Sequence, residues 1–465
     1  MLNLLIKPFW FFGIEVAVQN RVGEEMYGFY FSLFNWAFIL NIILDLGITN
    51  FNNRAISRDQ RRLGPHLASI VPLKFLLSIL YAAIVFIAGA IIGYSALQFK
   101  LLAVLVFNQF LSSFILYMRS NISGLQLFRT DSLLSVLDRT LMIIMNSILL
   151  WTSITQKEYR IEWFVYTQTL SYSLTLMVVG FVVMFHAGKP RLEFNLRKAL
   201  HILRYSYPFA ILILLMSFFN RLDSVMIERL LDDGKVQAGI YAQSFRVLDA
   251  LSQFAVLFAA LLLPMFSRMI KSREETGDLV RISSSLLLAV ALGVAIAGLF
   301  FNEEIIRLMY HEAELRSEAI FSILMFGFIF ISTSYIYGTL LTANRNLKQL
   351  NILAGITVLL NVTLNLILIP IFKAYGAAIA SLTSQAFYAL SQVILVHRII
   401  NPGISLKVYG KILSFGLLTL VTGFLLDRYM EWIPAFLLLV VFSGVSAVLT
   451  GLVRPGEIIS IFREK

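Results

Sequence analysis

Four basic residues lie inside long apolar stretches of the sequence, where little water is available to solvate a charge. They are Lys74, Arg139, Arg221 and Arg246. A charged side chain at the centre of a membrane-spanning helix costs about 2.5–3.5 kcal/mol on insertion scales, so such residues are functional candidates. A guanidinium group stays charged and can bind phosphate through two parallel hydrogen bonds. We therefore expect these residues, and Arg139 and Arg246 first, to contact an anionic headgroup.

The four cations differ in their depth along the apolar segments. Arg139 lies about eight residues into segment 131–154, which is roughly 12 Å along a helix that rises 1.5 Å per residue. Arg246 lies at a similar depth in segment 236–266. Lys74 and Arg221 lie closer to the ends of their segments, where a side chain can snorkel to the interface or form a structural ion pair. Cavity lining and a structural role are both open for these two residues.

Four acidic residues accompany the cations and have two interpretations, ion coupling or charge balance. They are Glu15, Asp45, Asp223 and Asp249. Glu15 is the candidate for coupling to a cation or a proton, because a carboxylate withdrawn from water suits either role. Asp45 lies in an Asp-Leu-Gly turn within reach of Arg54. The other two aspartates each follow an arginine by two or three residues and would balance its charge.

The residue content gives no support to several kinds of chemistry. The sequence has no cysteine, and its five histidines show no spacing typical of zinc ligands, so we assign no metal. It has no Walker-type phosphate loop, so we expect transport without ATP, driven by a gradient or running downhill. Na⁺, H⁺ and no coupling ion all remain open. The net charge of +11 resides mainly in short links, which argues against nucleic acid as a partner.

The composition places most of the chain in a lipid bilayer. Hydrophobic residues make up 58% of the sequence, charged residues make up 14%, and the mean hydropathy is +0.81. A soluble core of 465 residues could not bury so much apolar surface, which excludes a soluble enzyme. Consecutive aromatic residues at 9–12 are expected to face lipid or the interface.

We predict an all-α polytopic membrane protein with about fourteen spanning helices. A span needs about 20 mainly apolar residues. The candidate segments are 1–19, 27–51, 68–95, 99–121, 131–154, 161–186, 203–223, 236–266, 282–301, 317–342, 347–370, 374–400, 407–427 and 432–452. The first segment is barely long enough, so the natural start could lie upstream.

The links between segments predict the topology and the domain borders. With fourteen spans, 23 Lys and Arg residues lie on the side of link 52–66 and 10 on the opposite side. Cytoplasmic links carry the excess of Lys and Arg, so both termini should be cytoplasmic. The longest basic link, near residue 190, divides the chain into bundles 1–190 and 191–402. Residues 403–465 form an additional helix pair and a tail.

A short motif occurs twice in the sequence. Gly23 is followed after four residues by Gly28, Phe29 and Tyr30, and the same pattern returns 211 residues later as Gly234, then Gly239-Ile240-Tyr241. We interpret this as two related halves, each opening with a helix, a short hinge and a helix.

A known family matches the positions of these motifs. Several motifs occur together in this sequence. They are the two Gly-apolar-Tyr motifs, Asp45-Leu46-Gly47, Asn220-Arg221-Leu222-Asp223, and the stretch from Asn361 to Pro370 that leads into Tyr375-Gly376. In this combination the chain resembles the polysaccharide transporters of the multidrug/oligosaccharidyl-lipid/polysaccharide exporter superfamily, which include the O-antigen flippases. Family members usually have more residues before the first hinge, which again leaves the length of helix one open.

The resemblance implies a V-shaped pair of six-helix bundles around a cationic cavity, with alternating access. It implies a glycan on undecaprenyl diphosphate as the substrate, moved across a bacterial inner membrane. Polysaccharide polymerase and chain-length machinery would be candidate partners.

Three other functions are weighed against this one. A cation-coupled drug exporter of the same superfamily would favour twelve helices and a more acidic cavity. A membrane glycan polymerase or ligase would need a long external loop with catalytic residues, whereas no link here exceeds roughly 20 residues. An assembly protein without transport of its own would not require the intramembrane charges.

Overall fold

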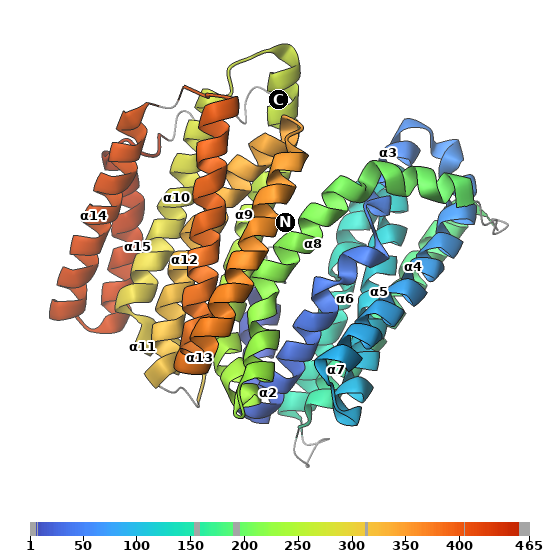
Figure 1. Cartoon of the computed structure of the whole chain (residues 1–465), viewed down its shortest axis with the longest axis horizontal. Coiled ribbons are helices and arrows are strands. Elements are labelled where there is room, and N and C mark those ends of the chain that lie inside the picture. Colours follow the sequence, from blue (N-terminus) through green and yellow to red (C-terminus); the bar gives the residue numbers. More distant parts are fainter. Residues whose placement is uncertain are drawn as a thin grey trace. The chain divides into compact units, whose positions relative to one another are not determined.

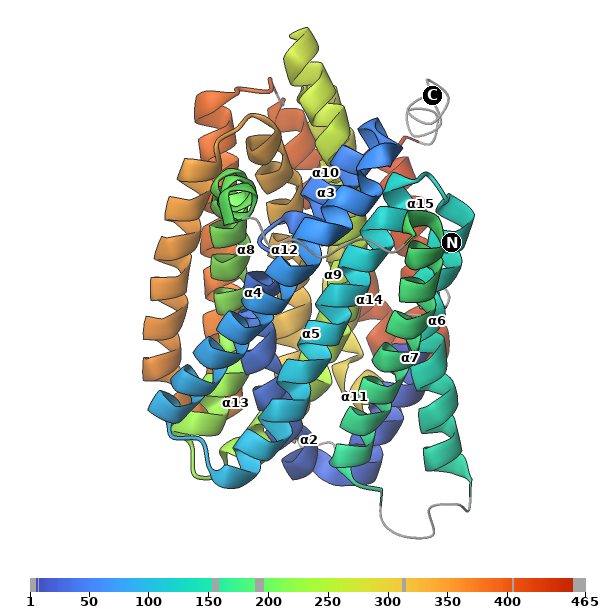
Figure 2. The ribbon, with the colours of Figure 1, turned by 90° about the vertical axis from the view of Figure 1, so that its right-hand side faces the viewer.

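The computed structural model of the protein describes residues 6, 8–152, 159–188, 196–311, 315–403 and 405–454. Every regular element within these ranges is a helix, which confirms the predicted all-α class (Figures 1 and 2). The chain forms two compact units, Met1–Gly239 and Ile240–Lys465. The predicted border near residue 190 lies outside the described residues.

The first unit contains the following helices in chain order: the π-helix η1 (Trp10–Glu15), α2 (Val16–Ile39), η2 (Asn41–Leu44), α3 (Ile48–Arg58), η3 (Gln60–Arg62), α4 (Leu63–Ile92), α5 (Ala96–Gly124), α6 (Phe128–Trp151), α7 (Ile161–Ala187) and α8 (Leu196–Leu230). Helix α9 (Gly234–Ser272) begins in this unit. The second unit continues with α10 (Gly277–Phe300), α11 (Asn302–Met309), α12 (Leu315–Ala343), α13 (Leu347–Ile399), α14 (Leu406–Tyr429) and α15 (Trp432–Leu449).

Eleven helices in the described part of the chain are long and apolar enough to cross a membrane, and one bent pair is a twelfth candidate. Helix α13 has 53 residues, or about 80 Å at 1.5 Å per residue, which exceeds two crossings of a 30 Å hydrocarbon core. Its backbone is non-helical at Lys373, three residues after Pro370. Helix α2 is likewise interrupted at Gly23. Dividing both helices at these breaks gives fourteen segments in the described part of the chain, although the predicted first segment, 1–19, lies partly outside it.

One candidate span is a bent pair of helical parts, η1 with α2 and η2 with α3. The two parts, Trp10–Ile39 and Asn41–Arg58, meet at Leu40 and are bent by 47°. The predicted Asp-Leu-Gly turn follows within the second part, between η2 and α3, where Leu46 and Gly47 both have a positive φ. Glycine adopts this left-handed conformation without the steric cost that a Cβ adds, which ends η2 and lets α3 start in a new direction.

Helices α3 to α7 enclose the apolar core of the first unit (Figure 2). Ile56, Leu73, Phe114, Leu134 and Val183 are among its buried side chains. The outer sides of these helices are also apolar, with large exposed side chains such as Ile79 and Ile91. Inner and outer faces are equally hydrophobic because lipid replaces water outside, so close packing rather than water exclusion holds such helices together.

In the second unit, α10 contacts α12, α14 and α15, and α12 contacts α13 (Figure 1). The apolar clusters between α10 and the C-terminal pair include Ile296, Phe301 and Leu439 at one end and Phe415 and Ala447 at the other. Helices α14 and α15 are the predicted additional pair.

The two copies of the glycine motif lie against each other inside the first unit. A Cβ atom on Gly28 would overlap the carbonyl oxygen of Lys235, and one on Gly239 would overlap the carbonyl oxygen of Glu24. Gly28 and Gly239 are 211 residues apart, and the residues that they touch, Glu24 and Lys235, are also 211 residues apart. Each motif therefore packs on the equivalent backbone of the other, as expected for repeats related by a two-fold axis.

Candidate functional site

Arg139 lies near the middle of α6, and its side chain is 34% exposed. Its guanidinium carbon lies 5.3 Å from the centroid of the Trp10 ring, a cation–π distance. Its Nε atom lies 4.0 Å from Oδ2 of Asp138, and its Nη1 atom lies 3.8 Å from the sulfur of Met142. A guanidinium has five N–H donors, so these contacts leave donors for an incoming anion.

Aromatic rings form one wall of this site. Trp10 stacks on Phe164 with 5.8 Å between ring centroids, and Tyr30 meets the edge of Phe164 at 5.4 Å. All three rings are buried. Of the four aromatic residues at 9–12, Phe9 and Phe12 are exposed as expected, whereas Trp10 and Phe11 are buried, which corrects the expectation for these two. Successive residues point in directions about 100° apart on a helix, so four in a row cannot share one face.

Glu15 ends the π-helix η1 and is buried. Glu15, Asp138, Tyr172 and Tyr30 are the titratable residues within electrostatic range of Arg139. The sequence had assigned Arg139 to the headgroup and Glu15 to ion coupling, and the structure brings both into one cluster. We call Trp10, Glu15, Tyr30, Asp138, Arg139 and Tyr172 the Arg139 cluster. Its two carboxylates and one guanidinium give a formal charge of −1. π-Helical turns are frequent at functional sites, which fits this position.

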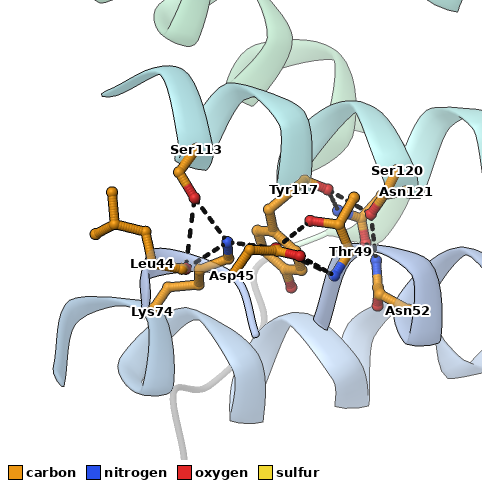
Figure 3. Close-up of polar contacts among 9 residues, drawn as sticks. All are labelled: Leu44, Asp45, Thr49, Asn52, Lys74, Ser113, Tyr117, Ser120 and Asn121. Atoms are coloured by element: carbon orange, nitrogen blue, oxygen red, sulfur yellow. Dashed lines mark hydrogen bonds and ion pairs between the residues drawn. The ribbon is translucent and has the colours of Figure 1, made fainter. Parts of the chain in front are cut away.

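Lys74 in α4 is buried and holds the bend between η2 and α3 (Figure 3). Its ammonium donates to the carbonyl oxygen of Leu44 at 2.8 Å, to Oδ1 of Asp45 at 2.8 Å and to Oγ of Ser113 at 3.0 Å. These three acceptors match the three N–H donors of an ammonium group. At the bend, the N–H of Ile48 bonds to the carbonyl of Asp45 rather than to that of Leu44. Lys74 thus satisfies a backbone acceptor that a helix break frees inside the membrane.

Asp45 pairs with Lys74 rather than with Arg54, the partner suggested by the sequence. Its carboxylate also accepts the N–H of Thr49 at 3.2 Å and the Thr49 hydroxyl, as a capping residue does at a helix start. Arg54 is exposed on α3. In this structure Lys74 and Asp45 therefore make structural contacts that fix the start of α3.

Arg221 in α8 is bound to α2. Its Nη1 atom donates to Oδ1 of Asn35 at 3.0 Å, and its guanidinium carbon lies 4.2 Å from the Phe38 ring centroid. Asn35 in turn donates to Oγ of Ser224 at 2.8 Å. The side chain joins two helices of the first unit and is half-buried.

Asp223 and Arg246 are buried, and Asp249 is half-buried one turn after Arg246 on α9. Asp223 lies in the first unit, and the other two residues lie in the second. Their predicted roles, headgroup contact for Arg246 and coupling or charge balance for the aspartates, stay predictions.

One buried carboxylate escaped the sequence analysis. Glu228, near the end of α8, accepts from Nε2 of Gln98 at 2.9 Å and from Nε of Arg229 at 2.6 Å. Arg229 stacks on Tyr94, in the turn between α4 and α5, at 4.6 Å. Burial raises the pKa of Tyr94 and the Glu228 carboxylate raises it further, while Arg229 lowers it, so the phenol stays protonated at neutral pH. This group ties α8 to the α4–α5 turn.

Three further residues that contact the intramembrane cations were absent from the sequence-based candidates, namely Asp138, Asn35 and Ser113. Asp138 directly precedes Arg139, so its charge inside an apolar segment was a usable signal. Asn35 and Ser113 are uncharged, and a search for intramembrane charges does not find them. Among the described residues, no group of three or more His, Asp or Glu side chains could hold a metal ion.

Two family models match the sequence. The model described as "Polysaccharide biosynthesis protein" matches residues 5–270, and the model described as "Lipid II flippase MurJ" matches residues 141–443. Each match spans more than half of the chain. No curated protein matches the sequence.

Solved structures with the same fold include a lipid II flippase MurJ in an inward closed conformation. The TM-score is 0.73 at 14% identity, over 97% of this chain and 98% of that chain. An inward-facing multidrug resistance MATE family transporter of the MOP superfamily gives 0.60 at 16% identity, over 84% and 94%. A MOP superfamily transporter from Pyrococcus furiosus gives 0.58 at 17% identity, over 87% and 94%. At these identities the likeness shows a common fold.

The predicted motifs, the helical architecture and the two family matches agree on one assignment. The protein belongs to the polysaccharide biosynthesis protein family, and over residues 141–443 it also matches the lipid II flippase family.

Proposed function

We propose that the protein moves an oligosaccharide linked to undecaprenyl diphosphate from the cytoplasmic to the periplasmic leaflet of a bacterial inner membrane. The product would serve O-antigen, exopolysaccharide or capsule synthesis, and movement would occur by alternating access. The observation that carries this proposal is the Arg139 cluster in a member of a flippase family. A guanidinium beside an aromatic wall suits a diphosphate, because it offers paired donors and cannot lose its charge.

The two carboxylates of the cluster supply a route to coupling. With Glu15 and Asp138 ionised, an anion approaching Arg139 meets two negative charges. A proton or Na⁺ bound at the carboxylates would remove that repulsion and free the guanidinium. In this proposal cation binding and diphosphate binding strengthen each other.

The test is complementation of a strain that lacks its oligosaccharide-lipid flippase, at matched expression. Wild type should restore the surface glycan, whereas Arg139→Ala and Arg246→Ala should not. Arg428→Ala, at an exposed position on α14, is the control and should behave as wild type. If wild type fails here and also fails to move radiolabelled lipid-linked glycans from several strains in vesicles, the proposal is wrong.

A drug exporter of the same superfamily is the second candidate. The two carboxylates around Arg139 and the fold shared with MATE transporters favour it. It predicts that expression raises resistance to cationic drugs and that Arg139→Ala leaves this resistance intact.

A polymerase or ligase role would instead change glycan length or attachment without any flipping in vesicles. Full function of both arginine variants in the complementation assay would favour an assembly role.

Polymerase and chain-length machinery are proposed as partners, and both termini are proposed to be cytoplasmic. Both proposals follow from the flippase role and from the Lys and Arg excess in the links. The protein is proposed to act without catalysis of its own.

A further inference from the structure

Helix α3 is the last part of the bent candidate span. It begins after the 47° bend and the Asp-Leu-Gly turn, and its first residues are fixed by the contacts of Lys74 and Asp45 (Figure 3). This candidate span ends at Arg58 and the next one begins at Gln60, so α3 and η3 lie at the border between two spans, where hydrocarbon gives way to headgroups.

One side of α3 is packed on the protein. Ile48, Asn52 and Ile56 are buried, and Nδ2 of Asn52 donates to Oγ of Ser120 at 2.9 Å and to Oδ1 of Asn121 at 3.0 Å on α5. A Cβ atom on Gly124 would lie 2.8 Å from Cβ of Ile56, so the two helices meet closely there. This side leaves α3 little freedom to rotate.

The other side carries arginines. Arg54 and Arg58 are exposed on α3, and Arg61 and Arg62 are exposed on η3 directly after it. Phe51, at the start of the same surface, is 37% exposed. We call these five residues the α3 basic surface. An aromatic ring beside arginines is typical of segments that lie in the membrane interface.

The basic surface contains little compensating charge. Asp59 is the acid between residues 48 and 62, so this segment has a net charge of +3. Oδ2 of Asp59 lies 3.4 Å from Nε of Arg62, but the two side chains are 45% and 58% exposed, so the pair contributes little. Within the described ranges, Arg54, Arg58 and Arg61 form no ion pair with an acid.

We propose that the α3 basic surface binds the headgroups of anionic phospholipids. Its position at the end of a span, its rigid inner side and its unbalanced arginines each favour a phosphate-rich membrane surface over open solvent. Arginine suits this ligand because its fork matches phosphate oxygens. The proposal is separate from cargo transport, because none of these residues belongs to the Arg139 cluster.

The absence of cysteine makes a direct test simple. Ser57→Cys places a single thiol on the exposed side of α3, where the serine hydroxyl bonds only within its own helix. The purified full chain is labelled there with a fluorophore and placed in lipid nanodiscs. Quenching is then compared between nanodiscs with spin-labelled phosphatidylglycerol and nanodiscs with spin-labelled phosphatidylcholine at the same mole fraction.

The proposal expects a clear lipid preference. One arginine near an anionic surface changes affinity by roughly five-fold, so quenching by phosphatidylglycerol should indicate at least about five-fold enrichment. Replacing Arg54, Arg58, Arg61 and Arg62 with Gln should bring the two lipids to equal quenching. Raising salt from 0.1 to 1 M should have the same effect on the unsubstituted surface, since the screening length falls from about 10 to 3 Å. This salt arm does not depend on the folding of a variant.

Arg428→Gln, at an exposed position on α14, is the matched control and should keep the enrichment. Equal quenching by the two lipids without any arginine substitution would overturn the proposal, as would enrichment that survives the four substitutions. Inorganic pyrophosphate separates a membrane surface from a site for soluble diphosphate. If it abolishes the preference while sodium chloride of equal ionic strength does not, the surface binds diphosphates and the lipid assignment is wrong.

Discussion

At the scale of single residues, Arg139 and Glu15 are linked through one electrostatic cluster. When an anionic ligand binds Arg139, Glu15 loses the positive charge that balances it. Glu15 is buried, where little water can solvate a carboxylate, and Arg139 is the cation of its cluster. An anion that takes over the guanidinium therefore leaves Glu15 in need of a cation or a proton.

This leads to a prediction for Glu15→Gln. We expect the variant to bind lipid diphosphates but to lose its response to imposed ion or pH gradients, with gradient-driven transport roughly ten-fold lower, equivalent to about 1.4 kcal/mol. Transport in vesicles with and without a gradient measures this. Glu25→Gln, at an exposed position on α2, is the control and should remain coupled. Unchanged coupling in Glu15→Gln would rule out this carboxylate as the coupling group.

Lys74 gives a second prediction at the residue scale. Lys74→Met should lower the free energy of unfolding by about 1–3 kcal/mol, because the half-buried Asp45 and the carbonyl oxygen of Leu44 lose their donor. The double variant Lys74→Met with Asp45→Asn should lose less than the single variant. Unfolding in detergent, followed by circular dichroism, measures both. If Lys74→Met instead kept its stability and lost only flipping, Lys74 would be a cargo contact.

At the scale of elements, the crossing of the two glycine motifs fixes how α2 and α9 begin. Gln19 adds a hydrogen bond from Nε2 to the carbonyl oxygen of Gly239 at 3.0 Å. Ser32 donates to the carbonyl oxygen of Ser224 at 3.2 Å, which extends the contact to α8. Backbone groups carry much of this contact, so side-chain size at the two glycines decides whether it can form.

Gly28→Ala and Gly239→Ala should each destabilise the protein by about 1–3 kcal/mol, the usual cost of overpacking. The methyl group would overlap a carbonyl oxygen of the other motif, which cannot move as a side chain can. Gly180→Ala on α7 has nothing within 4 Å of the new Cβ and should be neutral or stabilising. Thermal unfolding temperatures of the three variants, measured in one detergent, compare them. Equal temperatures for all three would show that the crossing is loose.

At the scale of the whole molecule, the cysteine-free chain allows a direct test of the predicted topology. Ser57→Cys and Leu97→Cys place single thiols at exposed positions on α3 and at the start of α5. An impermeant thiol reagent added to intact cells with a permeable outer membrane should label position 97 at least about ten-fold more than position 57. Cell lysis should make both positions reactive. Labelling of position 57 in intact cells would reverse the orientation inferred from Lys and Arg.

Much of the architecture was predictable because hydropathy, Gly-Pro punctuation and link charge are local properties of the sequence. The helical class and the Asp-Leu-Gly turn were both expected. The family was also recognisable from its motifs, and the two family matches confirm it.

The partners of the intramembrane charges were decided by the tertiary structure. Arg221 binds Asn35, which lies 186 residues away in the sequence. Asp45 pairs with Lys74, 29 positions away, and not with Arg54, which is nearer in the sequence. The sequence identifies where a charge must be neutralised, because insertion into lipid is costly for each residue alone. It does not identify the group that neutralises the charge, because that depends on which helices pack together and how each is rotated. The sequence therefore determined the family and the list of intramembrane charges, whereas the fold decided that Arg139 and Glu15 share a site and that Lys74 holds a bend.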